Sequence, residues 1–181
     1  MDVKKVGVLG CGLMGSGIAQ VCATAGFAVT VLEVEQKFLD KGFAGIEKSL
    51  AKLAERPPEK GGITALQKDA IRARLKGTTN KADLADCDIV IEAIIENVEE
   101  KKKMHASLDG VVKKDAIFAS NTSSISITEL LTATKRPERF CPTVWVCRPG
   151  ICPRPTTRPP PARFCLTGWP VAASYPGWWA S

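Results

Sequence analysis

Histidine is nearly absent from this sequence of 181 residues, in which His105 is the single imidazole. The seven cysteines form no Cys-x-x-Cys unit and none of them neighbours the histidine. A zinc site needs several such ligands at short spacings, so these two absences argue against any metal centre. The cysteines also lack the paired spacing of a disulfide framework, so we expect a reducing compartment, either the cytoplasm, which we favour, or an organelle matrix.

Charge is missing from residues 6–32, a stretch long enough to be compared with a membrane span. With Lys4 and Lys5 in front of it, the same stretch also imitates a secretory signal. Its many glycines and polar residues such as Gln20 and Thr24 would weaken a helix in either role. We therefore favour a glycine-rich turn within a folded domain and expect no membrane partner.

Acidic residues are absent after Glu138, although the formal net charge of the chain is +6. Most of that excess comes from the late arginines Arg148, Arg154, Arg158 and Arg163. This region shows no nucleic-acid-binding motif, and the rest of the chain is nearly balanced in charge. The composition therefore predicts no nucleic-acid partner.

A Gly-Cys-Gly-Leu-Met-Gly run contains Gly10, Gly12 and Gly15, between the apolar residues 6–9 and a helix-like segment, residues 18–25. In this context the first glycine allows a tight turn and the second lets backbone N–H groups approach a pyrophosphate. The third lets the helix pack closely on the sheet, and the phosphates would lie at the helix N-terminus. The pattern predicts a dinucleotide-binding turn.

Glu33 follows a second apolar segment, residues 28–32, at the interval after Gly10 expected of a ribose-binding carboxylate. A carboxylate accepts hydrogen bonds from the ribose 2′-hydroxyl and repels a 2′-phosphate. The cofactor is therefore predicted to be NAD rather than NADP.

Alternating strand and helix patterns predict a doubly wound (Rossmann) α/β fold with a mostly parallel sheet. Two long polar helices between the second and third strands suggest a helical arm, although an ordinary crossover helix with a decorated loop fits the pattern equally well. Thr64 is the expected N-cap of the second of these helices and Gly77 its stop. The predicted strands are 6–9, 28–32, 77–79, 89–95 and 116–120, and the predicted helices are 18–25, 35–55, 64–75, 98–112 and 126–133.

The composition changes after Cys141, where prolines and all the tryptophans gather and no helical or strand period persists. Dense proline removes hydrogen-bond donors and breaks ladders. We expect residues 1–141 to form an NAD-binding domain and residues 142–181 to be an irregular tail rather than a domain.

Three motifs together resemble the N-terminal domain of the L-3-hydroxyacyl-CoA dehydrogenases, including bacterial 3-hydroxybutyryl-CoA dehydrogenases. They are the glycine run, the Asp-Ile-Val-Ile-Glu-Ala segment 88–93, and the Ser-Asn-Thr-Ser-Ser segment 120–124. They occur in order, and the resemblance covers residues 4–140. The 2-hydroxyacid-type dehydrogenases share only part of the first motif and lack the other two.

The resemblance implies that NAD takes a hydride from C3 of a 3-hydroxyacyl-CoA in fatty-acid metabolism. It implies that Ser123 contacts both cofactor and substrate, which suits a hydroxyl that can donate and accept. It places Ser49 and Arg56 at the acyl-CoA contacts of the arm. The implied cofactor-binding residues are Gly10, Cys11, Gly12, Leu13, Met14, Gly15, Glu33, Glu96, Lys101 and Ser123.

Several of these residues have plainer interpretations. Without the family, Ser123 would be a turn or helix-capping residue, and Glu96 and Lys101 would be the solvated start of a helix. Glu92 is harder to dismiss, since a carboxylate in a buried strand needs partners.

The resemblance stops after Cys141. The family continues there with a strand whose histidine removes the hydroxyl proton, but here Val144 occupies the place of that histidine and no later histidine or glutamate follows. His105 lies on a different element, where a catalytic role is not expected. We expect impaired activity, with a frameshifted or misjoined reading frame and no C-terminal dimer domain. The alternative is a catalytically inactive NAD-binding fragment.

Overall fold

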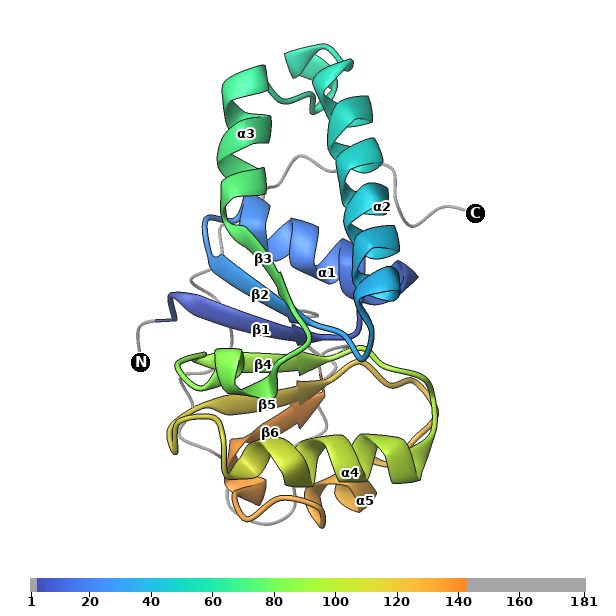
Figure 1. Cartoon of the computed structure of the whole chain (residues 1–181), viewed down its shortest axis with the longest axis vertical. Coiled ribbons are helices and arrows are strands. Elements are labelled where there is room, and N and C mark those ends of the chain that lie inside the picture. Colours follow the sequence, from blue (N-terminus) through green and yellow to red (C-terminus); the bar gives the residue numbers. More distant parts are fainter. Residues whose placement is uncertain (1–2, 143–181) are drawn as a thin grey trace.

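Six parallel strands form the sheet at the centre of the computed structural model, which describes residues 3–142 (Figure 1). The strand order is β3-β2-β1-β4-β5-β6, with neighbours paired in parallel register such as Val8 with Val31 and with Ile91. The sheet is doubly wound, as predicted: strands are added on one side of β1 up to β3 and then on its other side from β4 onward. The strand β6 was not predicted. The strands are β1 (Lys5–Leu9), β2 (Ala28–Leu32), β3 (Leu75–Thr78), β4 (Ile89–Glu92), β5 (Ile117–Ser120) and β6 (Phe140–Pro142).

Helices cover both faces of the sheet, with α1, α2 and α3 on one side and α4 and α5 on the other (Figure 1). Successive strand residues point to opposite faces, so Val8 packs in the cluster under the first group and Leu9 in the cluster under the second. Both faces are buried, which explains the nearly continuous apolar strands. The α-helices are α1 (Leu13–Thr24), α2 (Gln36–Ala54), α3 (Ala65–Ala73), α4 (Val98–Asp109) and α5 (Ile127–Leu131); short 3₁₀ helices are η1 (Pro58–Lys60), η2 (Lys81–Leu84) and η3 (Pro137–Arg139).

The predicted arm is formed by α2 and α3, which extend away from the sheet between β2 and β3 (Figure 1). Thr64 caps α3 as expected: its Oγ1 accepts from Gln67 N at 3.2 Å, and Gln67 Oε1 accepts from Thr64 N at 2.8 Å. This reciprocal capping box fixes the start of the second arm helix. Within residues 3–142, no helix is both long and apolar enough to cross a membrane.

Several predicted boundaries are wrong, for example the start of the first helix, which begins at Leu13 rather than at residue 18. Two others have a clear physical cause. Gly77 does not stop a helix: α3 ends at Ala73, and Gly77 lies inside β3, where an added Cβ would come within 2.7 Å of Leu39 Cδ2. The residue is a glycine because α2 packs on the strand at this point.

The strand predicted over 89–95 ends at Glu92. The Glu92 Oε1 accepts a hydrogen bond from Ile94 N at 2.9 Å, and this bond turns the chain out of the sheet. Residues 143–181, most of the predicted tail, lie outside the described residues.

We expect Gly42→Ala to lower the free energy of unfolding by about 1–3 kcal/mol, the usual cost of overpacking a core. The added Cβ would lie 2.8 Å from Cys11 Cβ and closer still to the Cys11 sulfur and carbonyl oxygen, so α2 would have to move. Gly45→Ala in the same helix is the matched control, because its Cβ meets nothing within 4 Å. It should stabilise the chain by about 0.5–1 kcal/mol through helix propensity. Urea titrations of both variants measure the difference, and equal effects would contradict the proposed contact.

Candidate functional site

The glycine run forms the turn between β1 and α1. Gly10 has a φ of +92°, and a Cβ there would lie 2.7 Å from Ala93 O, so both conformation and space require glycine. At Gly15 a Cβ would come within 2.8 Å of Gly10 C, so the helix packs closely on its own turn. Gly12 differs, because a Cβ there would meet nothing within 4 Å. The second glycine thus faces open space at the start of α1, where a phosphate could approach the backbone.

Glu33 lies directly after β2 and is held against this turn. Cys11 N donates to Glu33 Oε2 at 2.7 Å, and Val34 N donates to Glu33 Oε1 at 2.9 Å. The carboxylate is half-buried, and both of its oxygens keep acceptor capacity for a ligand. The two predicted parts of the nucleotide site, the glycine turn and the acid, are therefore in direct contact.

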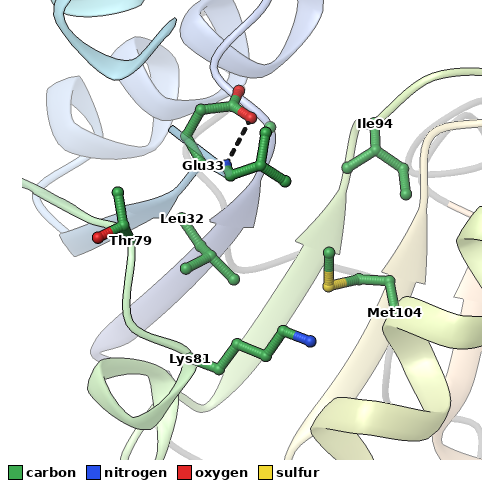
Figure 2. A pocket seen from close by; sticks show the side chains of 8 residues that line it. Leu32, Glu33, Thr79, Lys81, Ile94 and Met104 are labelled. Carbon is green, nitrogen blue, oxygen red and sulfur yellow. Dashed lines mark hydrogen bonds between the residues drawn. The ribbon is translucent and has the colours of Figure 1, made fainter. Parts of the chain in front are cut away.

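A cavity of about 230 Å³ opens beside Glu33 at the carboxyl ends of the strands (Figure 2). This edge of an open parallel sheet, next to the reversal between β1 and β4, is the usual place for a ligand. Gly10 and Glu33 in its wall are predicted from sequence, whereas the residues that follow β3 and β4 and the one from α4 are not. Its lining is Gly10, Leu32, Glu33, Val34, Thr79, Lys81, Ile94 and Met104.

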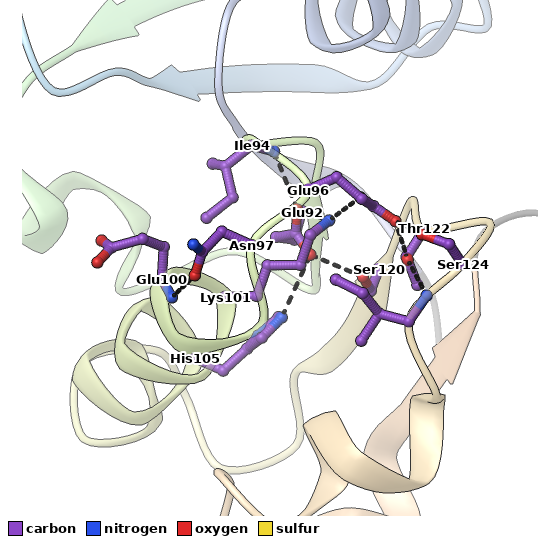
Figure 3. Close-up of polar contacts among 11 residues, drawn as sticks. Glu92, Ile94, Glu96, Asn97, Glu100, Lys101, His105, Ser120, Thr122 and Ser124 are labelled. Carbon is purple, nitrogen blue, oxygen red and sulfur yellow. Dashed lines mark hydrogen bonds and ion pairs between the residues drawn. The ribbon is translucent and has the colours of Figure 1, made fainter.

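A cluster of hydrogen-bonded polar and charged side chains lies at the carboxyl ends of β4 and β5 (Figure 3). Lys101 Nζ lies 2.9 Å from both Glu92 Oε1 and Glu96 Oε2, and the side chains of Glu92 and Lys101 are completely buried. Ser120 Oγ donates to Glu92 Oε2 at 2.6 Å. Glu92 therefore has the partners that a buried carboxylate needs. Lys101 is not the solvated helix residue of the plainer interpretation.

Glu96 connects this buried pair to the Asn-Thr-Ser-Ser segment. Thr122 Oγ1 donates to Glu96 Oε1, and Ser124 Oγ donates to the same oxygen at 3.1 Å. Burial by itself would raise the pKa of Glu96, but the hydrogen bonds from Thr122 and Lys101 outweigh it and lower the pKa to about 2. The carboxylate is thus charged at neutral pH and holds both flanks of Ser123.

Ser123 itself is exposed, between the two residues that bond Glu96. It does not cap α5, whose N-cap is Ser126, and the turn is closed by Thr122 Oγ1 accepting from Ile125 N at 3.1 Å. The capping interpretation is therefore not supported, and the Ser123 hydroxyl is available to a ligand.

His105 lies in α4 with its side chain fully buried. Its ring packs edge-on against Phe118 and Phe140, with centroid separations of 5.4 and 4.8 Å. Its Nε2 lies 3.8 Å from Glu92 Oε2, beyond hydrogen-bond distance. A base must reach the proton that it removes, and the His105 ring is enclosed by the protein. That His105 has no catalytic role stays a prediction.

The arm residues Ser49 and Arg56 are not part of the cavity wall. Ser49 is half-buried in α2 and Arg56 is exposed just beyond its end. The structure thus brings together the glycine turn and Glu33, and separately Glu96, Lys101 and the Ser123 segment, but it leaves the arm residues apart. Val144 lies outside the described residues.

Residues 5–152 match the family model described as "3-hydroxyacyl-CoA dehydrogenase, NAD binding domain". A probable 3-hydroxybutyryl-CoA dehydrogenase of Deinococcus radiodurans is 49% identical over 136 residues, which are 75% of this chain and 47% of that protein. A 3-hydroxybutyryl-CoA dehydrogenase of Bradyrhizobium diazoefficiens is 47% identical over 138 residues, 76% of this chain and 46% of that protein. The chain therefore spans about half the length of the curated relatives that it matches.

Among solved structures, the (S)-3-hydroxybutyryl-CoA dehydrogenase of Ralstonia eutropha is similar, with a TM-score of 0.73 and 42% sequence identity. The match covers 78% of this chain and 48% of that chain. The fold and the sequence thus point to the same group of proteins.

The lowered pKa of Glu96 predicts an acid-sensitive fold. Because its folded pKa of about 2 lies below the ordinary 4.5, the Glu96 charge stabilises the folded state above pH 4.5. This stabilisation is lost as the pH falls toward 2. We expect Glu96→Gln to lose less stability than the native chain between about pH 5 and pH 2, by urea titration. Glu99→Gln, at an exposed position in the first turn of α4, is the control and should keep the native pH dependence. A Glu96→Gln profile that follows the native one would refute this role of the carboxylate.

Proposed function

This chain belongs to the 3-hydroxyacyl-CoA dehydrogenase family, as part of its NAD-binding domain, and we propose that it binds NAD in the cavity beside Glu33. The observation that carries the proposal is the contact between Glu33 and the backbone N–H of Cys11. It joins the ribose-binding acid to the phosphate-binding turn, and the open space beyond Gly12 fits a pyrophosphate.

In the proposed complex, the Glu33 carboxylate accepts hydrogen bonds from the adenosine ribose. Backbone N–H groups at the start of α1 face the two phosphates, where the helix dipole favours negative charge. Gly10, Cys11, Gly12, Leu13, Met14 and Gly15 supply this surface, and the exposed Leu13 and Met14 side chains lie next to it.

We propose that the parent activity is oxidation of a 3-hydroxyacyl-CoA to the 3-oxoacyl-CoA. Bound NAD supplies the hydride acceptor for this chemistry. The Ser123 hydroxyl faces the reacting oxygen as donor or acceptor, while Lys101 and Glu96 fix the segment that carries it. Ser49 and Arg56 of the arm contact the CoA portion, since a guanidinium matches phosphate geometry.

A second candidate function is NAD binding without turnover. Val144 occupies the place where the resemblance expects the proton-removing histidine, and an apolar side chain cannot act as a base. For the 181-residue chain we favour this function. We also propose a cytoplasmic location, because the cysteines within residues 3–142 are free, and homodimerisation of the parent enzyme.

Glu33→Ala should weaken NAD binding by on the order of 1–3 kcal/mol, because a charge-assisted hydrogen bond to the ribose is lost. NADP should be affected less, since removal of the charge also relieves repulsion of its 2′-phosphate. Calorimetric titration of both cofactors measures the two changes. Glu35→Ala removes the same charge two residues later, outside the cavity wall, and should leave both affinities unchanged. Tighter binding of NADP than NAD to the native chain would show that Glu33 does not select the cofactor.

The purified 181-residue chain should form NADH from NAD and 3-hydroxybutyryl-CoA at least about 10²-fold more slowly than an intact family member, because a positioned base contributes that much. The Deinococcus radiodurans relative, assayed alongside, provides the reference rate. Absorbance at the NADH band measures turnover, and calorimetry measures binding. Turnover at the reference rate would overturn the second candidate function, and His105→Gln would then test whether that imidazole supplies the base.

A further inference from the structure

We infer that Lys81 recognises the edge of the adenine base that lies farthest from the ribose, an inference that rests on the proposed NAD site. Lys81 lines the same cavity as Glu33 but comes from η2, which follows β3. Figure 2 shows the two side chains at opposite ends of the cavity, with Leu32 between them. The site thus has an acceptor at one end and a cation at the other.

The backbone that carries Lys81 is fixed by two local hydrogen bonds. Asn80 N donates to Thr78 Oγ1 at 3.0 Å, and Ala82 N donates to Asn80 Oδ1 at 3.1 Å. Side chains that bond the backbone in this way stabilise a specific turn. Lys81 therefore leaves the end of β3 in a defined direction.

The ammonium group is also anchored, on the opposite wall of the cavity. Lys81 Nζ donates to Ser107 Oγ at 2.9 Å, and Ser107 Oγ donates to Met104 O at 2.8 Å. Both partners belong to α4, and Met104 itself lines the cavity. The side chain thus bridges from η2 to α4 and closes the end of the cavity opposite Glu33.

The shape and chemistry of this space fit an adenine. If Glu33 binds the ribose, the base extends from that end along the apolar side chains of Leu32, Ile94 and Met104, which suit its flat faces. A lysine ammonium has three donors and Ser107 takes one of them. Adenine presents ring-nitrogen acceptors, and N1 lies on the edge opposite the sugar. Lys81 is therefore a specificity-determining residue for the base.

Lys81 does not lie where an NADP-specific cation would. A 2′-phosphate would be on the ribose, at the Glu33 end of the cavity, and Lys81 lies at the other end (Figure 2). A change at Lys81 should therefore alter binding of the base without changing the preference between NAD and NADP.

The experiment compares NAD with its 1,N6-ethenoadenine analogue, in which a two-carbon bridge covers N1 and N6. Both are titrated calorimetrically against the native 181-residue chain, Lys81→Met, and Lys103→Met. Methionine keeps much of the lysine's length without its charge. Lys103 is an exposed lysine of α4 that pairs with Glu100 and lies outside the cavity wall. Thermal unfolding of each variant checks that the fold is retained.

The native chain should bind NAD more tightly than the etheno analogue. Lys81→Met should weaken NAD binding by about five- to tenfold, as for loss of a charge-assisted hydrogen bond at a partly exposed site. The same variant should change binding of the analogue by less than about twofold, and its NAD-to-NADP preference should stay native. Lys103→Met should bind both ligands as the native chain does.

Equal weakening of NAD and the analogue would show that Lys81 acts through net charge or packing, and would overturn the inference. Unchanged NAD binding in Lys81→Met would overturn it as well and leave Lys81 as a structural bridge to Ser107. Failure of the native chain to bind NAD at all would instead overturn the proposed function, and this inference with it.

Discussion

The ion pair between Glu92 and Lys101 is the contact on which the Ser123 side of the site depends. Both side chains are fully buried, and a lone charge there would carry a large desolvation penalty. The pair is tolerated because the Glu92 oxygens also accept from Ser120 and from the backbone of Ile94. These bonds join β4, β5, α4 and the connecting loop at one point. The Lys101 ammonium also forms an ion pair with Glu96, at 2.9 Å from its Oε2.

The two halves of the site are therefore fixed in different ways. Backbone N–H groups of Cys11 and Val34 hold Glu33 at the glycine turn, so its position follows from the main chain of that turn and of the segment after β2. Side-chain bonds from Glu96 hold the Ser123 segment, and these start from the buried pair. A cofactor that extends from one half to the other would meet a rigid main-chain site at its adenosine end. At its other end it would meet the Ser123 segment, whose position depends on the charged side chains of Glu96 and Lys101.

Much of this arrangement could be predicted from sequence, because its signals are local. The doubly wound fold followed from apolar runs that alternate with helical patterns, and the assignment of Glu33 to the same nucleotide site as the turn followed from its interval after Gly10. The role of Gly77 could not be predicted from such local signals. A glycine that stops a helix and one that makes room for Leu39 look the same in sequence, and only the packing of α2 distinguishes them.

Lys101 is a similar case, because the charged residues around it gave no sign of which lysine is buried. Lys81 and Met104 meet in one cavity only because the sheet brings the ends of β3 and α4 together.

The close packing of α2 on the glycine turn also determines the chemistry of the thiol within that turn. Cys11 is buried beneath Gly42, and burial, together with the nearby Glu33 charge, raises the pKa of the thiol to about 11. Only the thiolate reacts readily with alkylating agents and oxidants, and very little thiolate forms at neutral pH with such a pKa. The surface proposed to hold the phosphates therefore contains a cysteine that is protected from modification. Oxidants should therefore leave the Cys11 thiol unmodified while the exposed thioether of Met14, in the same glycine run, is oxidised first.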